Sequence, residues 1–167
     1  MSPHEYSIAL RIRHPSIDPN EITRHLGFIP QHEWRAGEPR EMGADEIGSS
    51  THLETYWLGL LPTRELAPSL AHGPLATVAL IKQALTAFKR SAIHPLQFRL
   101  YLTLLKMKRD AAFWREFAEQ GGTVECLLQV HETDRFQLDL SPTLLLAFVE
   151  LKIPLSIEVD GGLRAAA

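Results

Sequence analysis

The sequence has little of several features that would narrow its function. Cys126 is the single cysteine, so no disulfide can form within the chain, and we expect a reducing cytoplasm. We find no signal-peptide pattern and no apolar run long enough to span a bilayer. Basic and acidic residues number 17 and 20, which gives a formal net charge of −3. Such a balance lacks the positive footprint of a nucleic-acid or acidic-membrane binder.

The familiar catalytic and ligand-binding motifs are also missing. The His32-Glu-Trp-Arg-Ala36 segment and the segment from His131 to Arg135 each lack the second histidine of the metalloprotease pattern. The glycines of 43–48 have phosphate-loop spacing, but Ser49 follows where the loop requires lysine. Cys126 falls on the buried phase of its segment, which favours a core thiol over a nucleophile. The residues therefore predict no cofactor, no metal and no catalytic group.

What remains is the pattern of an ordinary globular chain. Its 167 residues are 45% hydrophobic, enough for one buried core. We expect a single domain over 1–160, with a long loop at 31–52 and a flexible tail at 161–167. Alternation of apolar and polar residues predicts strands with one buried and one wetter face. These strands are expected at 6–13, 53–61, 96–104, 124–131 and 155–160.

Helices are predicted between these strands from their end signals. Asp18 suits an N-cap, Pro19 suits the first turn and Gly27 suits a C-cap, which gives a helix over 18–27. A helix at 141–152 begins with Ser141 and Pro142 and is apolar almost all round, as expected if it is sandwiched or covers a partner subunit. Two further helices are expected at 73–90 and 110–122.

Together these segments predict an α+β fold. Residues 10–30 and 127–154 share a plan of strand, capped helix and Ile-Pro, as in a ferredoxin-like two-layer sandwich. We expect a mixed or antiparallel sheet of about five strands with helices packed on one face. The other face carries mixed charges and one aromatic, Tyr101, which is a poor platform for stacking RNA bases.

The loop after the first helix holds the best candidates for a binding site. Arginine beside tryptophan can hold a carboxylate or phosphate while the ring forms a wall. The alternative is structural, with Trp34 closing the end of the helical layer. The candidate ligand-binding residues are His32, Trp34, Arg35, Arg40 and Trp57.

The run from Leu26 to Glu38 resembles the bacterial domain of unknown function (DUF) 4279 family. The similarity consists of Leu-Gly at 26–27, then Pro30, Trp34-Arg35 and Gly37-Glu38, preceded by Asp-Pro-Asn-Glu-Ile at 18–22. The later Tyr56-Trp57 strand is similar too, and so is the closing strand–helix–strand from Leu127 to Val159. The resemblance implies a single α+β domain in a bacterial cytoplasm. It implies no activity, substrate or catalytic residue.

Two functions are consistent with these observations. The first is a non-enzymatic binding or interaction domain, either a homo-oligomer or the partner of another protein, with no nucleic acid or membrane involved. An accessory or immunity-like role belongs to this class. The alternative is a small-molecule-binding protein or enzyme with a site at the Trp34/Arg35/Trp57 loop, where His32 or Glu33 serves as acid or base.

Overall fold

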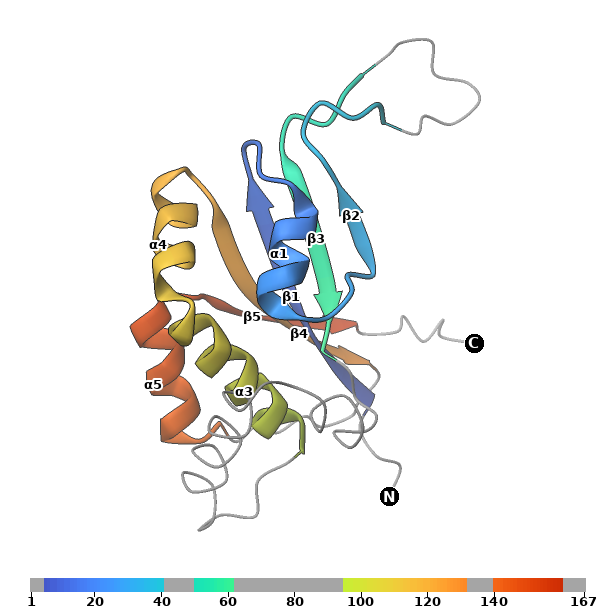
Figure 1. Cartoon of the computed structure of the whole chain (residues 1–167). Helices are drawn as coiled ribbons and strands as arrows, with labels where there is room; N and C mark the ends of the chain where they lie inside the picture. The colour runs from blue at the N-terminus through green and yellow to red at the C-terminus, as the bar shows by residue number, and fades with distance from the viewer. Residues whose placement is uncertain (1–4, 41–49, 62–94, 132–139, 161–167) are drawn as a thin grey trace, which may run out of the picture.

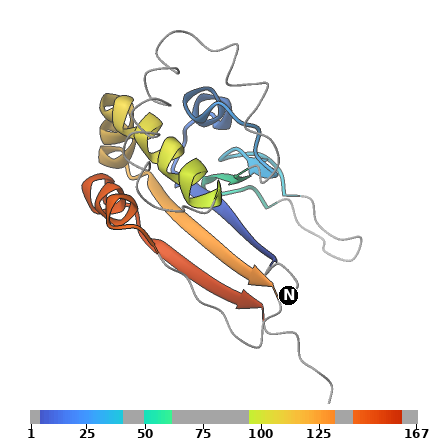
Figure 2. The same cartoon turned by 90° about the horizontal axis from the view of Figure 1, so that it is seen from below.

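The computed structural model describes residues 5–40, 50–61, 95–131 and 140–160, and it shows an α+β fold. Within these residues a five-stranded mixed sheet is covered on one face by four helices (Figure 1, Figure 2). None of the helices in this part of the chain is long and apolar enough to cross a bilayer.

The sheet is built around its first strand. β1 (Glu5–His14) lies at the centre and pairs antiparallel with β3 (Thr55–Leu60) on one side and β4 (Thr123–His131) on the other. Short β2 (His32–Trp34) pairs antiparallel with β3, and β5 (Leu155–Asp160) pairs parallel with β4. The order is β2-β3-β1-β4-β5, so β2 and β5 form the edges of the sheet that the structure describes.

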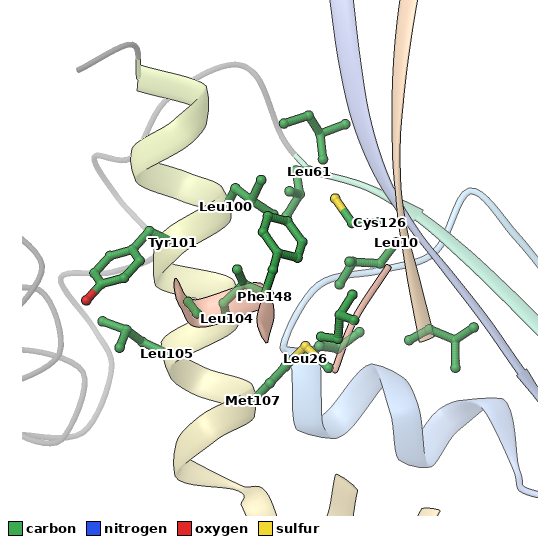
Figure 3. Packing of buried hydrophobic residues seen from close by; sticks show 14 of the residues in the cluster. Leu10, Leu26, Leu61, Leu100, Tyr101, Leu104, Leu105, Met107, Cys126 and Phe148 are labelled. Carbon is green, nitrogen blue, oxygen red and sulfur yellow. The ribbon is translucent and has the colours of Figure 1, made fainter. Parts of the chain in front are cut away.

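Strand alternation and helical spacing send their apolar side chains into one core. The helix-facing positions of β1 and β4 pack against the buried sides of α1 (Pro19–Leu26), α3 (Pro95–Arg109), α4 (Ala111–Glu119) and α5 (Pro142–Leu151). In Figure 3, Leu100 and Leu104 of α3 gather around Phe148 of α5. Burial of each such side chain contributes about 1.5–3 kcal/mol.

The predicted helix over 18–27 is confirmed, and its ends explain its position. The Asp18 carboxylate accepts a hydrogen bond from the Asn20 N–H at 2.9 Å, and Pro19 occupies the first turn. Gly27 ends the helix with φ 75°, and Lys106 Nζ of α3 donates to the free Leu26 carbonyl at 3.0 Å. The end of α1 is therefore fixed directly to α3. The helices predicted at 110–122 and 141–152 are confirmed as α4 and α5.

The predicted strand at 96–104 is wrong, because this segment lies within helix α3. Its leucines alternate with polar residues, but apolar side chains also recur along α3 at helical spacing, where Leu100, Leu104 and Met107 are buried. Helix α3 as a whole is rich in leucine, lysine and arginine, which favour helix over strand. Arg99 and Tyr101 are accordingly buried helix residues and do not lie on the sheet.

The predicted topology and loop also need correction. The ferredoxin-like arrangement is not confirmed for the whole sheet, because β5 adds a fifth strand parallel to β4. The loop expected at 31–52 contains β2 and a bridge between Pro39 and Thr51, so both of its ends are paired. Three residues of strand are too few for sequence alternation to show. The helix expected at 73–90 and the tail at 161–167 lie outside the described residues.

A polar joint connects β1, β3 and the segment that leads into α1. His14 Nδ1 accepts the backbone N–H groups of Ser16 and Ile17 at 3.0 and 2.9 Å. Opposite His14 in the sheet, buried Thr55 donates its hydroxyl to the Ile17 carbonyl at 2.7 Å and accepts the Ala36 N–H at 3.1 Å. Buried backbone groups that regular structure leaves unpaired are thus satisfied by two side chains.

Candidate functional site

Exposed apolar side chains concentrate on the last helix and the last strand. Five of the seven large hydrophobic residues that the structure describes as exposed lie on α5 and β5. Figure 2 places both elements at the same margin of the molecule. We call this surface the apolar margin. Its residues, with their exposed fractions, are Leu145 (45%), Leu146 (58%), Val149 (72%), Ile157 (50%) and Val159 (60%).

The composition of α5 explains its share of this surface. Ser141 caps the helix through a bond from the Leu144 N–H, and Pro142 occupies the first turn. One side buries Leu144 and Phe148 against the core. The other side is also mainly aliphatic apart from Glu150, although a surface helix normally turns polar residues outward. The remaining aliphatic side chains of α5 are therefore left outside the core.

The position of β5 explains the rest of the apolar margin. Ile157 and Val159 share the phase of Leu128 and Val130, which are buried under the helices. On β5 the same phase is half exposed, because the helices that the structure describes do not extend over this edge (Figure 2). The sequence pattern predicted these two residues as core, and the structure exposes them instead.

The opposite face of β5 is held by polar contacts. Arg11 of β1 reaches across β4 to pair with Glu158 at 3.1 Å, and it also pairs with Glu125 at 3.3 Å. The Ser156 hydroxyl donates to the same Glu125 carboxylate. These side chains are partly exposed, so each ion pair contributes on the order of 0–1 kcal/mol. These contacts join β5 to β1 and β4 on the face away from the helices, and they do not involve the side chains on its helix side.

Two hollows lie beside α5. A groove of about 410 Å³ runs between α3 and α5 and is lined by Tyr101, Leu105 and Leu146, with the Lys108–Glu150 ion pair at 2.6 Å on its border. A second hollow of about 680 Å³ lies between α4 and the turn from α5 into β5, with mainly apolar walls that include Trp114 and Ile153. Sequence reasoning did not predict either hollow, because each is formed by elements that are distant along the chain.

The structure separates the two tryptophans of the sequence-predicted site. Trp34 lies opposite Tyr56 in the β2–β3 pairing, and its ring stacks on Tyr56 at 4.2 Å and on His52 at 4.7 Å. Trp57 follows Tyr56 along β3 and therefore faces the other side of the sheet, where it is fully buried. The two rings line no common surface.

Trp57 instead anchors α1 to the sheet. Its indole N–H donates to the Thr23 hydroxyl at 2.9 Å, and its ring meets Phe28 edge-on at 5.3 Å. Gly59 lies two residues further along β3, where a Cβ would overlap the Trp57 ring and come within 2.7 Å of Phe28. A glycine at this position therefore lets the indole lie flat along the strand.

The remaining predicted site residues are exposed and separate. Arg35 has its side chain 52% exposed and lies 3.5 Å from the Asp18 carboxylate, next to the start of α1. Arg40 and His32 are exposed, with His32 on the β2 edge opposite Leu58. Neither hollow beside α5 includes any of the five predicted residues.

Cys126, His25 and the possible metal ligands were the remaining side chains of interest for chemistry. Burial raises the pKa of the Cys126 thiol to about 12, so the thiolate nucleophile does not form near neutral pH. His25 stacks on Phe113 at 3.7 Å and contacts Asp110 at 3.2 Å. In the described part of the chain, no three histidine, cysteine or acidic residues gather as a metal site.

Comparisons with known proteins supply no relative. No protein-family model, curated protein or solved structure matches this chain. The resemblance to the DUF 4279 family therefore stays a prediction from the sequence.

Proposed function

We propose that this protein is a non-enzymatic interaction domain and that it binds a second copy of itself through the apolar margin. The observation that carries the proposal is the clustering of exposed Leu145, Leu146, Val149, Ile157 and Val159 on two consecutive elements. Burying their exposed parts is favourable by roughly 25 cal/mol per Å² of apolar surface. Large exposed apolar areas mark interaction sites in soluble proteins.

A second copy suits this surface for two reasons. The apolar margin is apolar throughout, and a two-fold axis would set it against an identical apolar surface. Glu150, the one charged residue of α5, already pairs with Lys108 of α3 at 2.6 Å. These two side chains neutralise each other, so they need no opposite charge from a different protein.

We also propose that β1 to β4 form a ferredoxin-like unit to which α5 and β5 are added. In support, the described elements run β1-α1-β2-β3-α3-α4-β4, and β1 pairs antiparallel with both β3 and β4. On this interpretation, the apolar margin coincides with the added helix and strand. The addition would then supply the interaction surface.

Light scattering on the purified protein tests the proposal. We expect a dimer for the wild type and a shift toward monomer for Val149→Glu or Leu146→Glu, because each places a charge in an apolar interface. A loss of about 2 kcal/mol corresponds to a roughly 30-fold weaker dissociation constant. Matched controls are Ile29→Glu and Leu53→Glu, whose side chains are 83% and 87% exposed elsewhere on the molecule.

Two results would contradict self-association. One is a monomeric wild type at concentrations up to about 1 mM, which corresponds to about −4 kcal/mol of binding free energy. The other is equal dissociation by the control substitutions, because this would place the interface away from α5 and β5.

A further inference from the structure

The outer edge of β5 offers backbone groups for pairing. Cys126 lies opposite Leu155, and its N–H donates to the Pro154 carbonyl at 2.9 Å. In a parallel ladder, alternate residues of one strand direct both backbone groups toward the same neighbour. The backbone N–H and C=O groups of Ser156 and Glu158 therefore point toward β4, as the Pro154 carbonyl does. Leu155, Ile157 and Val159 direct their N–H and C=O groups outward, where no strand in the described residues pairs with them.

We propose that two copies pair their β5 strands antiparallel about a two-fold axis at Ile157, which forms one continuous ten-stranded sheet. The proposal rests on self-association through the apolar margin and specifies its geometry. Ile157 would lie opposite Ile157 of the second copy, and Leu155 would lie opposite Val159. The outward N–H and C=O groups of Leu155, Ile157 and Val159 then pair with those of the second copy, which gives six inter-chain hydrogen bonds.

Side chains favour the same register. Paired residues share a face of the sheet, so Leu155, Ile157 and Val159 meet their counterparts on the helix side. On the other face, Ser156 would lie opposite Glu158, a pairing of a hydroxyl with a carboxylate. Leu155 follows directly after the turn from α5, so Val159 of the second copy would lie close to this helix.

The two neighbouring registers are less favourable. An axis at Glu158 would place two carboxylates directly opposite each other, which is destabilising. An axis at Ser156 would leave Val159 without an opposing outward residue and reduce the inter-chain backbone bonds to four. If one β5 strand slid by a single residue, its outward N–H and C=O groups would lie opposite backbone groups that already bond to β4. Apolar side chains would then also lie opposite polar ones.

Disulfide trapping distinguishes these registers. In the proposed one, residues 156 and 158 form a pair without mutual backbone bonds, with Cα atoms about 4.5 Å apart, which suits a disulfide. We expect Ser156→Cys chains mixed with size-tagged Glu158→Cys chains to form a mixed cross-linked dimer under mild oxidation. Either variant alone should cross-link far less. The wild type serves as the control, because its only cysteine is the buried Cys126.

Each other outcome is decisive. Self-linked Ser156→Cys would place the axis at 156, and self-linked Glu158→Cys would place it at 158; either result overturns the register. No link in any sample, with a wild-type dimer by light scattering, overturns edge pairing and leaves self-association standing. A monomeric wild type removes both proposals. Circular dichroism and light scattering of each cysteine variant confirm that a missing link does not reflect a lost fold or a lost dimer.

Discussion

At the scale of single residues, His14 has the most constrained environment. It is 2% exposed, and its Nδ1 accepts two backbone N–H groups, so this nitrogen must stay unprotonated. Burial lowers the pKa of His14 below 6.5, and the Gln120 side chain opposes this shift only in part. A proton on Nδ1 would face two donors, which makes the folded protein favour neutral imidazole.

This environment predicts a specific pH dependence. The unfolded chain takes up a proton at His14 below a pKa of about 6.5, while the folded chain resists until its lower pKa is reached. The contribution to stability is therefore complete above pH 6.5 and falls as the pH decreases through this window. Urea unfolding at pH 7.5 and 5.5 measures the loss. His14→Asn keeps a hydrogen-bond acceptor that does not titrate, so the variant should lose less unfolding free energy between the two pH values. Equal losses in the variant and the wild type would show that His14 is not the group responsible.

At the scale of elements, a part-buried hydrogen bond from the Trp57 indole to the Thr23 hydroxyl links α1 to the sheet. Thr23→Val keeps the shape of the side chain and leaves the indole N–H unsatisfied, which should cost about 1–3 kcal/mol of unfolding free energy. Thr23→Ser keeps the hydroxyl and serves as the matched control. Urea titration compares the two, and a valine variant as stable as the serine variant would show that the bond contributes nothing.

The sequence predicts elements well where burial alone decides them. Alternation gave the correct strands and phase for β1 and β4, because both are covered on the same face by helices. It failed for α3, where leucines satisfy the strand and the helix period together. It also assigned Ile157 to the core, since a local pattern does not reveal that its strand lies at an edge.

The candidate site was harder to predict than the fold. Alternation along β3 already separates Tyr56 from Trp57, but only the pairing of β2 with β3 shows that Trp34 lies with Tyr56. Strand order is set by contacts between distant segments, which one sequence does not display. The apolar character of α5 was the signal that could be read in advance, because a helix with no polar side requires cover on more than one side.

At the scale of the whole molecule, self-association ties stability to protein concentration. If only the folded chain dimerises, each tenfold increase in concentration should raise the Tm by about 1–3 °C. Val149→Glu should flatten this dependence, whereas Leu53→Glu should leave it unchanged. Differential scanning calorimetry across the concentration range measures both, and a wild-type Tm that stays constant would contradict dimerisation.

The central position of β1 affects when the sheet can form during synthesis of the chain. Ser7 contacts Gln129, which lies 122 positions later, and the central strand pairs with β4 along almost its whole length. During translation β1 therefore leaves the ribosome well before β4, one of its two neighbours in the sheet. Until β4 emerges, one side of β1 has no partner within the sheet. The pairing of β1 with β4 must therefore wait until β4 has emerged, and such long-range pairing slows folding.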